Sequence, residues 1–143
     1  MNDTAIRITR PDLGDLGSDP DLERALDAHR HAKGIRAAID AGHFHVARFG
    51  GAYAGGMIAD REFFQRGFVW LIWVEEPFRR NGVASALMRQ AEETCPSDDL
   101  FTSTNQSNIP AQRLFEKLGY TKTGIIENLD EGDPEIFYFK RLR

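Results

Sequence analysis

An unbroken apolar run that leads directly into a basic, glycine-containing turn constrains this chain more than any other feature. The run "FVWLIWV" at residues 68–74 has no polar member, which predicts a central strand buried on both faces. The next stretch, "PFRRNGVASALMRQAEE" at 77–93, repeats apolar residues at helical spacing and predicts an amphipathic helix. A buried strand followed by such a helix indicates an α/β fold.

The rest of the chain alternates between strand and helix patterns. We expect strands at 5–10 and 100–104, a helical region at 19–42 that forms one helix or two with an interruption at Gly34, a hairpin at 43–60 that turns at Gly50 and Gly51, a helix at 108–119, and a closing hairpin formed by 120–127 and 135–142. Together these elements predict one α/β domain with a mixed sheet over residues 1–143.

Composition excludes several classes of function. The formal net charge is -4, with 18 Lys and Arg against 22 Asp and Glu, and no basic stripe of the kind a nucleic-acid-binding protein carries. Cys95 is the single cysteine, so no internal disulfide can form and a reducing compartment is expected. The N-terminal residues 1–17 do not resemble a signal peptide, and no apolar run has the length of a membrane helix. We therefore expect a soluble, cytoplasmic protein.

The turn at the start of the 77–93 segment has the chemistry of an anion site. A helix N-terminus presents unpaired backbone N–H groups, and the helix dipole adds partial positive charge. Gly82 and Ala84 leave room for a ligand close to the backbone, while Arg79 and Arg80 attract negative charge. The alternative is a helix capped by Asn81 with solvated arginines. The segment matches neither the Walker phosphate-binding pattern nor GxGxxG.

A second segment distinguishes these alternatives. "NIPAQRLFEKLGY" at 108–120 matches the pattern N-x-x-A-x-x-L-Y/F-x-K-x-G-F/Y, and "RRNGVA" at 79–84 matches R/Q-x-x-G-x-G/A after a strand. With these two motifs in this order, the chain resembles the GNAT N-acetyltransferase superfamily. The resemblance implies a mostly antiparallel, twisted α/β sheet with splayed central strands, flanked by helices.

The resemblance also implies acetyl-CoA as the acetyl donor and co-substrate. The pyrophosphate would lie on the turn formed by Arg79, Arg80, Asn81, Gly82, Val83, Ala84 and Ser85. The pantetheine arm would run along the edge of the central strand at Ile72, Trp73 and Val74, with Asn108, Ala111 and Phe115 on its other side. The thioester would sit where the central strand and the strand at 100–104 splay apart. A backbone N–H near Val74 would then stabilise the developing negative charge.

Acyl transfer to an amine needs the neutral amine, so a base or a desolvating pocket is required. The position at which the family often has a tyrosine acid is Phe115, and Phe68 and Trp70 lie where some members keep a base. None of these three side chains can exchange a proton. Glu75 and Tyr138 are weak catalytic candidates, for which structural roles are an alternative. Ser103 and Thr104 are equally well explained by strand packing.

Several groups concern the acceptor. Glu127 and Asp130 lie in an acidic stretch, "IENLDEGDPE", which predicts either a rim that attracts a cationic amine or a solvated turn. Trp70 is a candidate wall of the acceptor pocket. His43 and His45 alternate on one strand but lack a third ligand, so we expect no metal site. We expect His29 and His31 to lie on different faces of one helix and to form no site.

These observations predict a small acetyl-CoA-dependent N-acetyltransferase that acts in a ternary complex on a primary amine of a small acceptor, and a cationic acceptor is one of the options. Two alternatives remain. One is a non-catalytic acyl-CoA-binding or regulatory domain, and the other is a peptide or protein N-acetyltransferase. A homodimer formed through the aromatic "EFF" at 62–64 is a further hypothesis.

Overall fold

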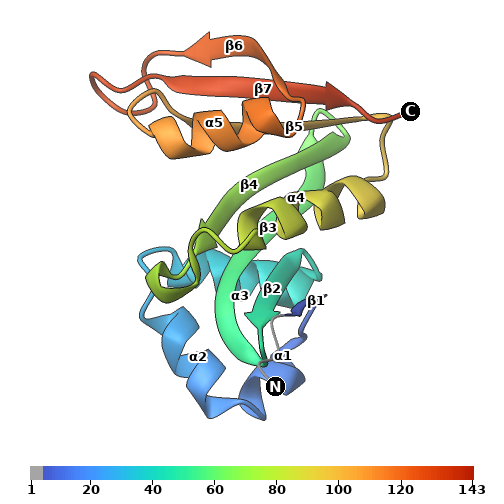
Figure 1. The fold of residues 1–143 in the computed structure, drawn as a ribbon, viewed down its shortest axis with the longest axis vertical. Helices are drawn as coiled ribbons and strands as arrows, with labels where there is room; N and C mark the ends of the chain where they lie inside the picture. The colour runs from blue at the N-terminus through green and yellow to red at the C-terminus, as the bar shows by residue number, and fades with distance from the viewer. Residues whose placement is uncertain (1–4) are drawn as a thin grey trace. The chain divides into compact units, whose positions relative to one another are not determined.

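A computed structural model describes residues 5–143, which form a mixed α/β structure. The strands of the described residues make one seven-stranded sheet in the order β1-β2-β3-β4-β5-β7-β6 (Figure 1). Four neighbouring pairs are antiparallel, namely β1 with β2, β2 with β3, β5 with β7 and β6 with β7, whereas β4 and β5 pair parallel. The expected fold class, a mostly antiparallel sheet flanked by helices, is therefore confirmed.

The strands are β1 (Ile6–Thr9), β2 (Phe44–Phe49), β3 (Ala52–Phe63), β4 (Arg66–Val74), β5 (Asp99–Asn105), β6 (Thr121–Ile126) and β7 (Glu135–Arg141). The helices are α1 (Leu13–Gly17), α2 (Pro20–Asp27), α3 (Ala32–Ala41), the 3-10 helix η1 (Glu76–Phe78), α4 (Val83–Thr94) and α5 (Ile109–Lys117). The contacts divide the chain into two compact units. The first contains the residues up to Ala59 together with Leu71–Gln90, and the second contains Asp60–Trp70 and Ala91–Arg143.

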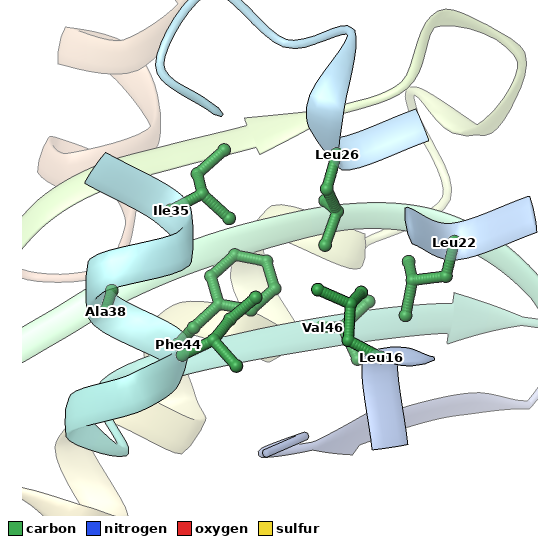
Figure 2. Packing of buried hydrophobic residues seen from close by; sticks show 8 residues of the cluster. Leu16, Leu22, Leu26, Ile35, Ala38, Phe44 and Val46 are labelled. Atoms are coloured by element: carbon green, nitrogen blue, oxygen red, sulfur yellow. The ribbon is translucent and has the colours of Figure 1, made fainter. Parts of the chain in front are cut away.

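The first unit is built around an apolar core between three helices and β2. Leu16, Leu22 and Leu26 from α1 and α2 point toward Ile35 and Ala38 of α3 and toward Phe44 and Val46 of β2 (Figure 2). Phe44 is completely buried. Apolar burial of this kind is the main favourable contribution to folding, so these helices are held by their buried faces.

Two glycines let β3 approach β4 in the first unit. A side chain at Gly55 would collide with the backbone carbonyl of Trp73, and one at Gly56 would collide with the Trp73 ring. The absence of a Cβ at these two positions is therefore a packing requirement. It fixes the position of Trp73, whose ring packs against the apolar core beside Phe44.

In the second unit, α5 covers one face of the strands β5 and β7 (Figure 1). Phe115 of α5 lies with its ring centroid 5.4 Å from that of Tyr138 on β7. Glu92, in the last turns of α4, accepts hydrogen bonds from Tyr120 and Lys140 and so ties the helix to the same region.

Two features of the helical region differ from expectation. The interruption falls at residues 28–31, and Gly34 lies inside α3. The helix tolerates Gly34 because a single glycine costs only about 1 kcal/mol relative to alanine. The short helix α1 was not predicted. Its sequence signal is the spacing of Asp12 and Asp15, which form a reciprocal capping box.

Among the described residues, no helix is both long and apolar enough to cross a membrane. Residues 1–4, which belong to the segment judged unlike a signal peptide, lie outside the described residues. The assignment of residues 1–143 to one domain stays a prediction.

We expect the Phe44→Ala variant to lose about 3–5 kcal/mol of unfolding free energy, because it removes a fully buried ring and leaves a cavity. Urea denaturation followed by circular dichroism measures this loss. Ile125→Ala is the control, since Ile125 is exposed and its truncation should change stability by only about 0.5 kcal/mol. Equal effects of the two substitutions would contradict the core assignment.

Candidate active site

The basic turn after β4 has backbone geometry suited to binding an anion. It follows η1 and contains two residues in the left-handed region, Arg80 with φ of 67° and Gly82 with φ of 81°. A side chain built at Gly82 would meet nothing within 4 Å, so the space beside the turn is open. The carbonyl of Gly82 accepts the first hydrogen bond of α4, from the Ala86 N–H at 3.0 Å. The N–H groups of the first helical turn that follow have no partner within the helix.

Asn81 acts differently from the cap expected of it. Its Nδ2 donates to the carbonyls of Phe78 and Arg79, each at 3.1 Å. Arg79 Nε donates to the carbonyl of Val74 at 3.2 Å. The expectation that Asn81 caps the helix is therefore wrong: Gly82, which reaches the left-handed conformation readily, occupies the position before the helix. The side chains of Asn81 and Arg79 engage carbonyl groups, and the Arg79 N–H donates to the carbonyl of Glu76 at 3.3 Å.

The end of β4 carries a polar and aromatic cluster. Trp73 Nε1 donates to the hydroxyl of Tyr53 at 2.8 Å, and the rings of Trp73 and His29 are 4.4 Å apart. Burial raises the pKa of Tyr53 to about 12, with a smaller contribution of the same sign from Glu75, so Tyr53 keeps its proton at neutral pH. The backbone N–H of Glu75 donates to the carbonyl of Ala54 at 2.7 Å, which anchors the start of the connection to η1.

His29 and His31 do come together, contrary to the sequence-based expectation. They lie between α2 and α3 and not within a helix, so helical spacing does not separate them. Their ring centroids are 5.6 Å apart, and the backbone N–H of His31 donates to Nδ1 of His29 at 3.0 Å. Desolvation, followed by the charges of His31 and Arg30, lowers the pKa of His29, while Glu75 opposes this shift. His29 is therefore a neutral imidazole at neutral pH, with its proton on Nε2.

In the second unit, the start of α5 uses the residues of the second motif locally. Asn108 is the N-cap, and its side chain accepts from the Ala111 N–H at 3.2 Å. Ala111 is half-buried and Phe115 is buried, so these two lie on the inner side of the helix. Phe115 contacts Tyr120 and Tyr138, which accounts for its place in the packing of this unit.

The acidic loop between β6 and β7 is fastened to the loop between β5 and α5. Asn105 Nδ2 donates to Asp130 Oδ2 at 2.8 Å, and Ser107 donates to Asp133 through both its N–H and its hydroxyl, at 3.0 and 2.6 Å. The carboxylate of Asp130 is thus engaged within the protein, whereas Glu127 is exposed. The stretch is an ordered connection with internal hydrogen bonds.

Trp70 and Tyr138 differ sharply in exposure. Trp70 is 48% exposed, and its Nε1 donates to Asp60 Oδ1 at 2.6 Å. Tyr138 is completely buried, and its hydroxyl has no hydrogen-bond partner among the described residues. Burial, and secondarily the charge of Glu116, raises the pKa of Tyr138, so the phenol stays protonated.

Sequence reasoning did not find the pair formed by Ser103 and Glu135. The Ser103 hydroxyl donates to Glu135 Oε2 at 2.7 Å, and both side chains are half-buried. The two residues are separated by 32 positions in the chain. Only the antiparallel pairing of β5 with β7, in which Ser103 lies opposite Phe137, brings them onto one face.

The comparisons with known proteins identify the family. The model of the acetyltransferase (GNAT) family matches residues 6–120. This match covers most of the chain and includes both motifs, so the chain belongs to the GNAT acetyltransferase family. The resemblance inferred from the sequence is confirmed. The comparison with curated proteins found no match.

Solved structures agree with this assignment. A GNAT-family acetyltransferase from Bacillus cereus is 32% identical, with a TM-score of 0.82 over 96% of this chain and 97% of that one. Ard1 from Thermoplasma volcanium is 20% identical, with a TM-score of 0.75 over 97% and 99%. The yncA acetyltransferase from Salmonella typhimurium, solved with acetyl-CoA, is 15% identical, with a TM-score of 0.70 over 97% and 95%. The last two comparisons show a shared fold.

In the described part of the chain, no three His, Cys, Asp or Glu residues are grouped as metal ligands would be. His45 is only 3% exposed. Burial, with smaller contributions from Arg10 and His43, lowers the pKa of His45 from 6.5 to about 4. His45 is therefore a buried neutral residue of the core.

We expect acid to destabilise the protein through His45. Between pH 6.5 and about 4 the unfolded histidine binds a proton that the folded one does not, so stability falls as the pH decreases through this window. The loss reaches up to about 3 kcal/mol. Urea denaturation at pH 7 and pH 4.5 measures it, and His45→Leu should reduce the difference. The exposed Ile125→Leu variant, which changes no titratable group, should leave the difference unchanged, and equal differences in both variants would refute this role of His45.

Proposed function

We propose that this chain is an acetyl-CoA-dependent N-acetyltransferase that moves an acetyl group to a primary amine of a small acceptor. The observation that carries the proposal is the turn at Arg79–Gly82, in a chain that belongs to the GNAT family. Family membership supports acetyl transfer with acetyl-CoA as co-substrate. The amine as acceptor, its small size and the direct attack in a ternary complex are the parts that we propose.

The residues present fit a pyrophosphate group. Gly82 has a positive φ and open space at the place where a Cβ would stand, so a ligand can approach the backbone. The side chains of Asn81 and Arg79 occupy carbonyl oxygens, which would otherwise repel an anion. Arg79 and Arg80 are exposed and add positive charge beside the N-terminus of α4.

We assign the pyrophosphate to the backbone of Arg79–Ser85, with Val83, Ala84 and Ser85 supplying amides of the first helical turn. Ile72, Trp73 and Val74 would contact the pantetheine arm through their backbone, and an N–H near Val74 would stabilise developing negative charge. Asn108, Ala111 and Phe115 would contact the arm from α5. When bound, acetyl-CoA supplies the acetyl group as an activated thioester.

The acceptor amine has to lose a proton before it can attack. Glu75, which directly follows β4, and Tyr138 of β7 are the titratable candidates. Glu75 is half-buried, whereas the completely buried Tyr138 is closed off from solvent and remains protonated. These positions favour Glu75 as the group that receives the amine proton. Trp70, Glu127 and Asp130 are proposed to lie on the acceptor side. The carboxylate of Asp130 is held in place there by the hydrogen bond that it accepts from Asn105.

We expect acetyl-CoA to bind saturably, and Gly82→Glu to weaken binding at least about 100-fold, because the substitution adds bulk and negative charge to the anion site. Calorimetric titration measures both affinities. Gly42→Glu is the matched control, since Gly42 also has a positive φ and open surroundings but lies at the end of α3. If the two variants bind acetyl-CoA equally well, the turn does not hold the pyrophosphate.

We expect release of free thiol from acetyl-CoA when a suitable primary amine is added. A thiol-reactive dye detects turnover with a panel containing spermidine, phenethylamine, lysine and a short peptide with a free amino terminus. Turnover with a small amine would support the proposal. Turnover with the peptide alone would identify a peptide N-acetyltransferase. Tight acetyl-CoA binding without turnover on any amine would indicate a non-catalytic acyl-CoA-binding domain.

A further inference from the structure

One face of the second unit combines aromatic rings with a fixed carboxylate. The parallel register of β4 and β5 covers three pairs and ends at Val69 and Thr102, where the Thr102 hydroxyl donates to the carbonyl of Val69 at 3.0 Å. Trp70 and Ser103 are the first residues beyond this register. Their side chains point away from the face that α5 covers, because Thr102 and Tyr138, which lie opposite one another, occupy that face.

The aromatic part of this face is built from three strands. Phe68 contacts Trp70 with ring centroids 4.2 Å apart and lies 6.0 Å from Phe137 of β7. Phe63 closes the group, at 4.6 Å from Phe68 and 5.9 Å from Phe137. Phe68 is buried, whereas Trp70 offers nearly half of its surface to solvent. The exposed ring is further oriented by its bond to Asp60.

Glu135 lies on the same face as Phe137, two residues before it on β7. Its carboxylate accepts the Ser103 hydroxyl at 2.7 Å, and this bond restricts its rotamer. The strand also starts from a fixed position. The Gln106 N–H donates to the carbonyl of Pro134 at 2.8 Å, and Asp133 accepts from Ser107. The side chain of Glu135 is thus held by Ser103, and the backbone just before it is held by Gln106. Such positioning is what a binding residue requires.

An oriented carboxylate on the same sheet face as an exposed indole has the chemistry of a site for an organic cation. A cation is attracted to the face of an aromatic ring, most strongly to tryptophan, and the ammonium group donates charge-assisted hydrogen bonds to a carboxylate. An anionic acceptor would be repelled by both Glu135 and Asp60. A neutral apolar compound would leave the carboxylate without a partner.

We propose that Glu135, oriented by Ser103, and the exposed ring of Trp70 form the acceptor subsite, and that its ligand is a primary ammonium compound. This inference rests on the proposed function and specifies its substrate class. Glu135 and Trp70 bind the cation, whereas Ser103 is a positioning residue that acts through Glu135.

We expect Glu135→Gln to weaken binding of phenethylammonium or spermidine about 10- to 100-fold, because Gln keeps an acceptor for Ser103 but removes the charge. Calorimetric titration measures binding with or without turnover. Glu93→Gln is the matched control, because Glu93 is an exposed residue of α4 and its substitution changes the net charge by the same amount. N-acetylphenethylamine, which has no charge, is the control ligand and should bind equally to the wild type and to Glu135→Gln.

Kinetics provide a second readout where an amine is turned over. Glu135→Gln should raise the KM for the amine and leave the KM for acetyl-CoA unchanged, and the wild-type KM for the amine should rise with salt more steeply than that of the variant. Ser103→Ala should have a smaller effect of the same kind. Trp70→Leu should weaken cation binding more than Trp70→Phe, which keeps an aromatic face.

Two outcomes would overturn the subsite. One is equal binding of the cations by wild type, Glu135→Gln and Glu93→Gln, and the other is no binding of either cation to well-folded wild type. Failure of the proposed function looks different, because there acetyl-CoA would not bind or no amine would release thiol. Cation binding that depends on Glu135 without turnover would support the subsite and contradict only the enzymatic assignment.

Discussion

The central constraint is that strand β4 pairs with β5 over its first half and packs against β3 over its second half. Its first half pairs parallel with β5, but only through Val69, where the Thr102 side chain takes the strand's carbonyl. Its second half lies against β3, where Gly55 and Gly56 leave room for Trp73. The residues released from parallel pairing are the ones that the family resemblance assigns to ligands.

The two proposed binding regions differ in how they recognise charge. The turn after β4 would bind through backbone amides beside its left-handed residues. The face around Glu135 would bind through one side chain that another side chain orients. A backbone site is recognisable from a local pattern, because glycine and small residues must stand at fixed positions. A side-chain site assembled across strands has no comparable local pattern.

This contrast explains which predictions succeeded. The hairpin at Gly50 and Gly51, the position of the central strand, the helix after Asn108 and the family itself were predicted correctly, because each depends on residues close together in sequence. The expected burial of that strand on both faces is wrong, since Trp70 is exposed and residues 71–74 are only half-buried. The helix break was predicted at Gly34, because glycine disfavours helix. The structure places it at residues 28–31, and Gly34 lies inside α3. The sequence predicted His29 and His31 on different faces of one helix. The helix ends before them, and their rings lie close together in the structure.

The sequence by itself determined the order of most elements, the glycine-containing basic turn and membership in the GNAT family. Periodicity, glycine positions and motif spacing are local properties, and the chain carries them whether it is folded or not. Only the tertiary structure decided that Asp130 and Asp133 fasten a loop, that Tyr138 is sealed off, and that Glu135 reaches Ser103. Strand register sets these contacts, because a shift of one residue turns every side chain to the opposite face of the sheet.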